Sequence, residues 1–314
     1  MIRRRTVLTT ALAAASAIGL AACGGESDSK GGGASDGSDG ATLSSVTISE
    51  DLGAEPTATF TPPLSITKPE AKLVVPGKGE KITAGDVLLL HSSYVDASTG
   101  DVLDSWWQGA PPRMLPVAED KIGKDAFSFL TTATVGSRFA MTGWQNDQSG
   151  QPRALLQIAD VDHRVFPLRA EGAKRQPADG VPVVELDKSG KPTLKKKPEG
   201  KPPTTTQRTI LINGTKPPTT AGSYLIMQYS GWTWDDGKQF DSSWDRGEPF
   251  GFVQGAQQVI QGWDENLVGI PVGSQVMLVI PPKEAYGEDA QAHELGGKTL
   301  IFVIDVLDSA KMHG

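Results

Sequence analysis

The chain has 314 residues, of which 38% are hydrophobic and 21% charged, an ordinary composition for a folded protein and a length that suits two domains. Its formal net charge of -7 argues against nucleic acid as the main partner, because nucleic-acid-binding domains usually carry a basic face. The 4 histidines show no metal-ligand spacing and there is no glycine-rich phosphate loop, so the sequence predicts neither a metal site nor a cofactor.

The N-terminal end has the pattern of a bacterial lipoprotein signal. Three arginines at 3–5 precede an apolar segment, 7–20, that is too short to span a bilayer. Leu20-Ala21-Ala22-Cys23 resembles a lipobox, whose cysteine becomes the first mature residue and carries lipid. We therefore expect 1–23 to be a signal peptide and Cys23 to be lipidated, giving an extracytoplasmic protein anchored at the membrane by acyl chains. An ordinary secretory signal with an incidental cysteine is the alternative.

The residues that follow are nearly all small or polar. Segment 24–42 is rich in Gly, Ser and Asp and cannot bury enough apolar surface to offset the entropy of the chain. The composition predicts a flexible tether between the lipid and the folded part.

Two stretches of the chain repeat each other. Thr83-Ala84-Gly85 matches Thr220-Ala221-Gly222 at an offset of 137 residues, whereas Leu155 to Val161 matches 300–306 at an offset of 145. The first copy is therefore eight residues shorter just before its last strand. Such a repeat predicts two homologous domains. Their expected bounds are 43–165 and 205–314.

The segment between the copies, 166–204, is expected to be a linker with an extra strand. It runs into a stretch, 188–218, that is rich in Pro, Lys, Gly and Thr, a composition typical of extended, exposed chain. Within it, 183–186 corresponds to 46–49 at the offset of 137, so each domain could begin with one additional strand.

Strand signals dominate the second copy. Three runs rich in β-branched or aromatic residues, 224–229, 274–280 and 299–306, are bounded by Gly, Pro or Asp. Alternate residues of the last run, Leu300, Phe302, Ile304 and Val306, share one face. One short helix is expected at 261–267, which makes the fold class α+β.

Several short motifs in this copy are specific when their order and spacing are taken together. They are Tyr229-Ser230-Gly231, Phe240-Asp241-Ser242, Pro249-Phe250-Gly251-Phe252, Val259-Ile260-Gln261-Gly262-Trp263, Ala285-Tyr286-Gly287 and Leu300-Ile301-Phe302. In this order they resemble FKBP-type peptidyl-prolyl cis/trans isomerases. The resemblance implies two FKBP-like domains, each a curved antiparallel β-sheet wrapped over a short α-helix.

The resemblance also implies roles. Trp263 would form the floor on which the proline ring rests, Tyr286 would offer its hydroxyl to a substrate carbonyl, and the backbone N–H of Ile260 would donate to the ligand. Asp241 would sit at the pocket edge near Arg246. The implied catalytic residues are Tyr229, Phe240, Asp241, Trp263, Tyr286 and Phe302. The implied substrate-binding residues are Arg246, Phe250, Val259 and Ile260.

The second copy departs from the family in a few places. Gln258 replaces a common acidic residue, which should alter contacts at the pocket rim. The loop after Gly287 is shorter than usual, and His293 and Leu295 fall near the positions of a family histidine and its neighbours without a clear alignment. The sequence therefore leaves the preference around proline open.

The first copy lacks the same side chains. The repeat offsets place Ser92, Leu103, Ala126 and Gln157 where the second copy has Tyr229, Phe240, Trp263 and Phe302, whereas Asp104 matches Asp241. We expect residues 43–165 to form a degenerate FKBP-like domain without isomerase activity. It would serve as a spacer, a client-binding surface or a packing partner.

The resemblance implies a peptidyl-prolyl cis/trans isomerase, active in its second domain only, that assists the folding of exported proteins. Proline-containing polypeptides would be its clients and macrolides its ligands. A non-enzymatic chaperone or binding module for proline-containing segments, and a surface adhesion or assembly module, are the competing hypotheses.

Overall fold

The computed structural model describes residues 41–147, 149–196 and 198–313. Cys23, the expected signal peptide and nearly all of the expected tether therefore lie outside the described residues. The chain divides into two compact units, an N-terminal unit that ends at Phe166 and a C-terminal unit over Pro167–Lys311. No helix in the described ranges is long and apolar enough to cross a membrane.

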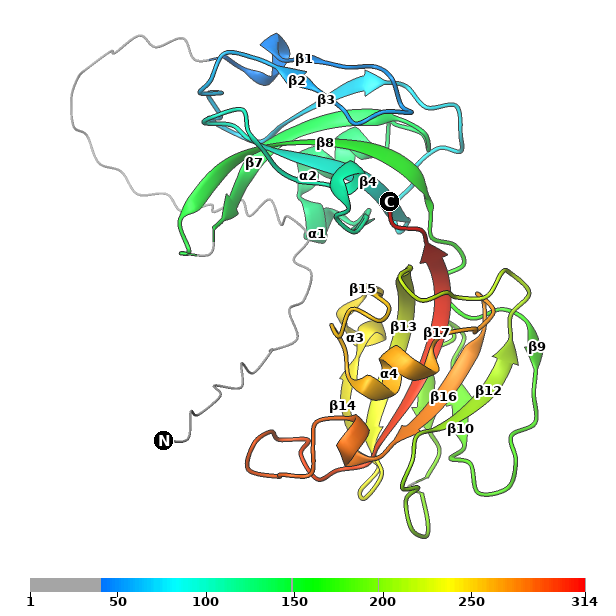
Figure 1. The fold of residues 1–314 in the computed structure, drawn as a ribbon. Helices are drawn as coiled ribbons and strands as arrows, with labels where there is room; N and C mark the ends of the chain where they lie inside the picture. The colour runs from blue at the N-terminus through cyan, green and yellow to red at the C-terminus, as the bar shows by residue number, and fades with distance from the viewer. Residues whose placement is uncertain (1–40, 148, 197, 314) are drawn as a thin grey trace, which may run out of the picture. The chain divides into compact units, whose positions relative to one another are not determined.

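The N-terminal unit is built on one antiparallel sheet of order β3-β7-β8-β4-β5, in which β6 also pairs with β4 (Figure 1). The strands of the sheet are β3 (Glu70–Val75), β4 (Val87–Asp96), β5 (Val102–Ser105), β6 (Arg113–Pro116), β7 (Arg138–Asn146) and β8 (Pro152–Arg164). The remaining elements are the 3₁₀ helices η1 (Leu43–Ser45) and η2 (Trp106–Gln108), the helices α1 (Glu119–Ile122) and α2 (Lys124–Leu130), and the paired strands β1 (Thr47–Ile48) and β2 (Ala58–Thr59).

The C-terminal unit is built on a sheet of order β14-β13-β17-β16-β12-β9, in which β15 also pairs with β13. Its strands are β9 (Ala173–Lys174), β12 (Gln207–Asn213), β13 (Tyr224–Thr233), β14 (Gln239–Ser242), β15 (Phe250–Val253), β16 (Gln275–Ile280) and β17 (Leu300–Ala310). The other elements are the paired strands β10 (Val184–Leu186) and β11 (Pro192–Leu194), the helices α3 (Ser243–Arg246) and α4 (Gln261–Asn266), and η3 (Pro282–Glu284).

Apart from the additional strand β9, the two main sheets have the same strand order, and their registers agree with the repeat. Tyr229 pairs with Ile304 in the C-terminal unit, and Ser92 pairs with Ala159 in the N-terminal unit. These pairs are related by the offsets of 137 and 145 that the sequence shows for the two strands. The missing residues of the first copy thus fall in the connection before β8 and leave the pairing intact.

The central strands of the C-terminal unit are buried on both faces. Leu300, Phe302 and Ile304 of β17 pack into the core on the side of α4, as the alternation of the sequence predicts. Ile301 and Val303, on the opposite face, form a second cluster with partners from the other strands and from the β10–β11 hairpin. The members of the second cluster are Leu211, Trp232, Trp234, Met277, Val279, Ile301 and Val303, with Val181, Val184 and Leu194 packed against them.

The structure differs from the sequence interpretation in segment 166–204, which belongs to the C-terminal unit from Pro167 onward. β9 pairs with β12, and β10 pairs with β11 instead of adding a strand to the main sheet. The Pro- and Lys-rich composition suggested an exposed linker. Sparse apolar residues within it nevertheless dock on a sheet face that would otherwise meet water.

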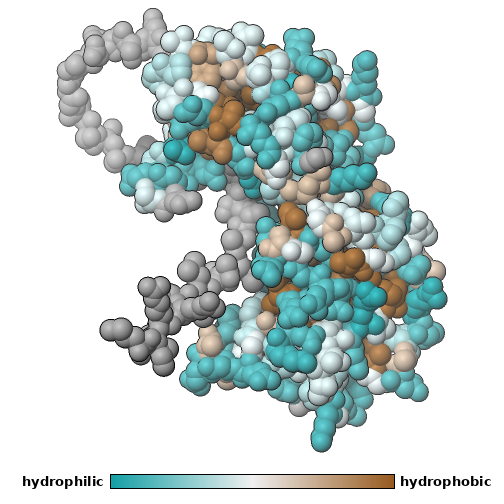
Figure 2. All heavy atoms as spheres, viewed as in Figure 1, coloured by the Kyte–Doolittle hydropathy of each residue, from teal (hydrophilic) through white to brown (hydrophobic). Residues whose placement is uncertain are grey.

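The expected elements of the second copy are present, with small changes. The helix predicted at 261–267 is α4, and the three predicted strands are β13, β16 and β17. The prediction of a single helix was incomplete, because one turn of helix, α3, follows β14 directly. On the face shown in Figure 2 apolar residues form small patches within a mostly hydrophilic surface, as expected when both faces of a sheet are covered.

A fragment that begins at residue 205 should be less stable than one that begins at Pro167. The shorter fragment loses the apolar contacts of β10 and β11 and the hydrogen bond from the Ala170 N–H to Asp305. Because burying one aliphatic side chain is worth about 1.5–3 kcal/mol, its free energy of unfolding should fall by roughly 3 kcal/mol or more. Denaturant unfolding of both fragments measures the difference, and equal values would contradict the assignment of this segment to the unit.

Candidate active site

Helix α4 holds Trp263 against the main sheet of the C-terminal unit. Ile260 caps the helix in an extended conformation, and its carbonyl accepts the N–H of Trp263 at 2.9 Å and of Asp264 at 3.2 Å. Gly262 allows the helix to come close to β16, since a Cβ there would lie 2.6 Å from Cγ2 of Ile280. Trp263 is thereby 4% exposed.

Aromatic rings from four strands, β13, β14, β15 and β17, lie around Trp263. Its ring centroid lies 5.0 Å from that of Tyr229 and 5.0 Å from that of Phe302, in both cases at 82°. Phe240 meets Phe302 edge-on at 5.5 Å, and Phe250 meets Tyr229 at 5.9 Å. Such edge-to-face contacts are favourable beyond the area they bury. The rings form one aromatic cluster, which consists of Tyr229, Phe240, Phe250, Trp263 and Phe302.

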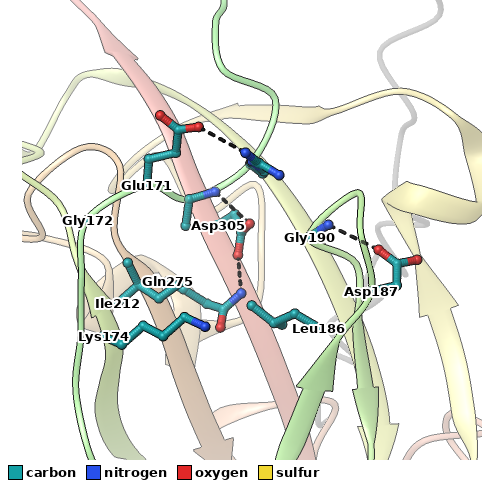
Figure 3. A pocket seen from close by; sticks show the side chains of 11 residues that line it. Glu171, Gly172, Lys174, Leu186, Asp187, Gly190, Ile212, Gln275 and Asp305 are labelled. Atoms are coloured by element: carbon teal, nitrogen blue, oxygen red, sulfur yellow. Dashed lines mark hydrogen bonds and ion pairs between the residues drawn. The ribbon is translucent and has the colours of Figure 1, made fainter.

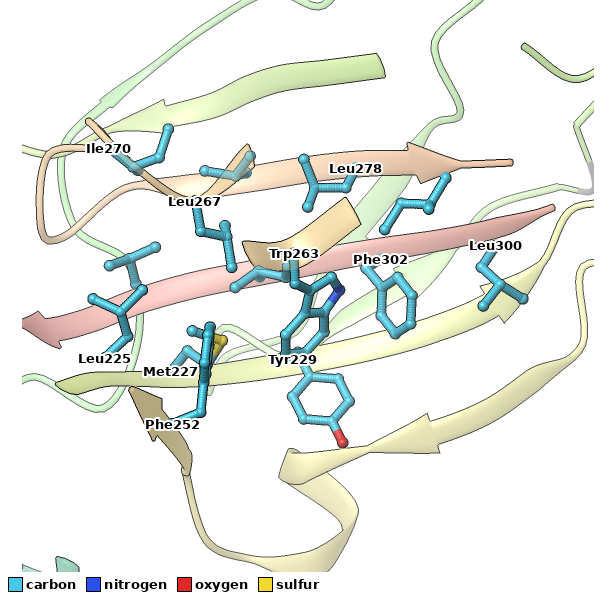
Figure 4. Close-up of a cluster of buried hydrophobic side chains, with 14 of the residues drawn as sticks. Leu225, Met227, Tyr229, Phe252, Trp263, Leu267, Ile270, Leu278, Leu300 and Phe302 are labelled. Carbon is cyan, nitrogen blue, oxygen red and sulfur yellow. The ribbon is translucent and has the colours of Figure 1, made fainter. Parts of the chain in front are cut away.

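Figure 4 shows Trp263 between Tyr229 and Phe302, with its indole nitrogen on the side of Phe302. This nitrogen is buried and has no hydrogen-bond partner among the described residues. The two rings stand nearly perpendicular, at 82°, an arrangement that is compatible with an N–H···π contact.

The aromatic cluster reaches the surface on one side. Tyr229 and Phe302 are buried, whereas Phe240, Phe250 and Tyr286 are half-buried. Val259 and Ile260, just before α4, are also half-buried and pack against the same core. A ligand can therefore reach an apolar surface whose base is buried.

A polar group closes one edge of the aromatic cluster. The Tyr229 hydroxyl donates to Oδ2 of Asp241, and Arg246 donates through one nitrogen to Oδ1 of Asp241 and through the other to the Tyr229 hydroxyl, at 2.9 Å. Burial, followed by the hydrogen bond to the Asp241 carboxylate, raises the pKa of the Tyr229 phenol. The phenol stays neutral, and Asp241 is held by two donors.

Tyr229 is also fixed through its backbone. Its N–H donates to Oγ of Ser243 at 2.8 Å, and the same hydroxyl donates to the side-chain carbonyl of Gln228. Ser243 is fully buried at the start of α3, so the turn of helix that the sequence did not predict locks the strand that carries Tyr229.

The short loop after Gly287 brings His293 onto Tyr286. The two rings stack at 4.2 Å with an angle of 5°, and burial raises the pKa of the Tyr286 phenol. Leu295 of the same loop is buried in the core beside the aromatic cluster. The shorter loop therefore still supplies a histidine and an apolar anchor, a point that the sequence left open.

Gly231 makes room for the two phenylalanine rings. A Cβ at this position would lie 2.7 Å from Cζ of Phe240 and 2.8 Å from Cε1 of Phe302. A glycine inside a strand often marks such a close approach, which is the signal that the sequence offers for this role.

Comparisons with known proteins agree with this geometry. The family model of the FKBP-type peptidyl-prolyl cis-trans isomerase matches residues 216–307. An FK506-binding protein of Streptomyces anulatus is 39% identical over 112 residues, which are 35% of this chain and 90% of that protein. The chain belongs to the FKBP family. A probable FK506-binding protein of Corynebacterium glutamicum is 40% identical over 88 residues, 28% of this chain and 73% of that protein.

Other FKBP relatives are matched over less of their length. The FK506-binding protein 2B of Rhizopus delemar is 49% identical over 89 residues, which are 28% of this chain and 43% of that protein. Among solved structures, FkpA from Escherichia coli is 29% identical with a TM-score of 0.32, covering 44% of this chain and 54% of that one. Such a TM-score is too low to bear on the fold.

The structure brings together all ten FKBP site residues that were predicted in the second copy. Eight of them belong to the core cluster on the side of α4 or pack against it, and Asp241 and Arg246 bind the Tyr229 hydroxyl. Their individual roles stay predictions. Gln258, the departure from the family, accepts the Val253 N–H at 2.9 Å and so closes the turn beside β15.

The equivalent place in the N-terminal unit is polar. Gln157 donates to Oγ of Ser92 at 3.2 Å where the C-terminal unit has Phe302 and Tyr229, and Ala126 lies in the core where that unit has Trp263. Tyr94 corresponds to Gly231, and Arg113, which pairs with Asp104 at 2.7 Å, lies over the Tyr94 ring.

The Tyr229 phenol should remain protonated in the folded protein at a pH where an ordinary tyrosine ionises, about 10. Since the folded pKa is raised, the stability that this phenol contributes is complete below that pH and is lost as the pH rises toward the folded pKa. Ultraviolet titration of the native chain and of Tyr229→Phe measures this. Their difference should show no phenol ionising near pH 10, and a step there would contradict the network.

Proposed function

We propose that the C-terminal unit accelerates the cis/trans isomerisation of X-Pro bonds in polypeptides by binding them in a dry aromatic pocket. Rotation about this bond needs no proton transfer and faces a barrier of about 18–20 kcal/mol that arises from amide resonance. The twisted amide has lost that resonance and is less polar than the planar form. An apolar surface therefore favours it over the hydrated, planar amide, and no catalytic base is required.

The observation that carries the proposal is the aromatic cluster around Trp263. Its rings are held at defined angles by α4, β13 and β17, so they can take up a proline ring without rearranging. The fixed position of the rings matters because their preference for the twisted amide depends on how they are oriented toward the proline ring. A thousandfold acceleration requires only about 4 kcal/mol of such preference.

The polar edge would orient the rest of the substrate. Asp241, held by Tyr229 and Arg246, gives a fixed carboxylate at the border of the apolar surface. Tyr286, braced by His293, would present its hydroxyl to a substrate carbonyl, and the Ile260 N–H would donate to the chain on the other side. These contacts would also serve macrolide ligands.

We further propose that the protein is exported and anchored through lipid on Cys23, and that it assists the folding of proteins outside the cytoplasm. The support is the pattern of basic start, short apolar segment and Leu20-Ala21-Ala22-Cys23. Mass spectrometry of the protein from membranes would test it. A mature protein whose first residue is not an acylated Cys23 would rule the anchor out.

The N-terminal unit we take to be an FKBP-like domain that has lost the isomerase site. The shared strand order and register support its kinship with the C-terminal unit. The Ser92–Gln157 hydrogen bond and Tyr94 at the position of Gly231 argue against an aromatic pocket there.

The isomerase proposal predicts that Trp263→Leu lowers kcat/KM for a proline peptide at least a hundredfold, about 2.7 kcal/mol, because the floor of the pocket is lost. Gly231→Ala should cost roughly tenfold by displacing Phe240 and Phe302. NMR exchange measurements on an X-Pro peptide give both values.

Val303→Ala is the matched control for these variants. Val303 is 1% exposed on the opposite face of the sheet, so the change should reduce stability by about 1–3 kcal/mol yet leave kcat/KM within about twofold. If all three variants lost activity in proportion to their loss of stability, the aromatic cluster would not be the active site. Peptide binding by the wild type without acceleration would favour a binding module over an enzyme.

A fragment of the N-terminal unit over 41–166 should show no acceleration of the same peptide. Its counterpart over 167–311 should retain most of the activity of the full chain, because all ten site residues lie within it. Measuring the isomerisation rate with each fragment tests whether only the C-terminal unit is active. Comparable rates from the two would overturn it.

A further inference from the structure

The repeat places two different polar pairs at the same point of the two sheets. Arg138 of β7 pairs across the strands with Asp160 of β8, and Gln275 of β16 pairs with Asp305 of β17. The offsets of 137 and 145 relate the two pairs, so they are equivalent positions. Both pairs lie on the face of the sheet opposite the helix of their unit. That face is covered by β1 and β2 in the N-terminal unit and by β10 and β11 in the C-terminal unit.

In the N-terminal unit a guanidinium fills this point. Arg138 is 0% exposed and donates to both oxygens of Asp160, at 2.6 and 2.8 Å. It also donates to the carbonyl of Ser49 at 2.9 Å and to that of Ala54 at 3.2 Å, both in the covering segment. The guanidinium therefore bridges the sheet and its cover with all three of its nitrogens engaged.

In the C-terminal unit the aspartate is retained and the guanidinium is not. Asp305 is 2% exposed, and its two oxygens accept from neutral donors, the side-chain amide of Gln275 at 2.8 Å and the Ala170 N–H at 2.7 Å. Burial raises the pKa of the Asp305 carboxyl to about 6. A buried carboxylate is costly unless a cation pairs with it.

A pocket of about 370 Å³ adjoins this carboxylate (Figure 3). Its floor is formed by the buried residues Ala170, Ile212, Gln275 and Asp305. Leu186, which is equivalent to Ser49, lies on the side of the covering hairpin. The space lies between the sheet and its cover, which is the place that the Arg138 guanidinium occupies in the other unit.

The charged residues that line the pocket can be balanced by one more cation. Arg169 and Glu171 pair with each other at 3.3 Å on the rim, and Lys174 and Asp187 contribute one charge of each sign. An ionised Asp305 then gives the lining one negative charge in excess. Exposed rim residues, including Glu171 and Lys174, border the pocket and give a ligand a way in from solvent.

We propose that the pocket beside Asp305 and Gln275 binds a guanidinium group, either from an arginine side chain of a polypeptide or from a small free guanidinium compound. The planar group can donate to the carboxylate and to backbone carbonyls of the hairpin together, as Arg138 does. An ammonium group lacks that planar fork of donors and fits less well. The site is on the opposite side of the sheet from the aromatic cluster.

Titration of the full-length chain with methylguanidinium, followed by NMR, tests the proposal. Saturable binding at one site is expected at pH 7.5, and it should weaken at pH 5 as Asp305 takes up a proton. Asp305→Asn should reduce the affinity at least tenfold. Gln275→Arg should abolish binding, because it recreates the internal pair of the N-terminal unit, and it should leave the chain folded.

Comparing an arginine peptide with methylguanidinium separates the sources of the group, and a matched citrulline peptide shows whether the guanidinium is what binds. Tighter binding of the arginine peptide than of methylguanidinium indicates a polypeptide ligand, and the reverse indicates a small compound. Asp305→Asn should leave kcat/KM for the proline peptide within about twofold. The proposal would be overturned if no saturable binding were seen, or if Asp305→Asn and Gln275→Arg bound methylguanidinium as tightly as the wild type. Binding that emerges only after Lys174→Met would also overturn it, because the chain's own lysine would then be the cation.

Discussion

Burial of the central strands on both faces is the constraint on which the C-terminal unit depends. β13, β16 and β17 are covered by α4 on one face and by the β10–β11 hairpin on the other. The β10–β11 hairpin buries one face of the sheet. The face that carries α4 can therefore present aromatic rings at its border while the sheet itself stays buried. Gly262 sets how closely α4 approaches, so the position of Trp263 follows from the same packing.

The two units share strand order and register, but only the C-terminal unit carries the aromatic cluster. Strand order and register are shared, so the backbone of the N-terminal unit could carry the same cluster. A hydrogen bond between Ser92 and Gln157 replaces a contact between two rings, and Tyr94 stands at the position of Gly231. On the opposite face the N-terminal unit has the larger side chain, because Arg138 pairs with Asp160 at the position where the C-terminal unit has Gln275 and a pocket.

The sequence predicted the parts of the fold that local pattern encodes. The helix that carries Trp263, the three central strands and the repeat offsets follow from residue types at fixed spacing, and the set of site residues follows from the resemblance to the FKBP family. The apolar character of Ile301 and Val303 was a signal of a second buried face, since a strand with water on one side would alternate.

Other features depend on tertiary packing and could not be predicted in the same way. The cover of that second face comes from a few apolar residues in a Pro- and Lys-rich segment, whose docking depends on a distant sheet. The stacking of His293 on Tyr286 depends on the path of an irregular loop, and the role of Gly231 depends on two rings that are remote in sequence.

Only one of the two related sheets is proposed to present a surface for proline. Chemical-shift mapping on the full chain with a proline-containing peptide tests it most directly. We predict that the perturbed signals cluster at Trp263, Tyr229, Phe302 and Tyr286, with none at Ser92, Ala126 or Gln157. Equal perturbation of both sets, or shifts confined to the N-terminal unit, would contradict the account.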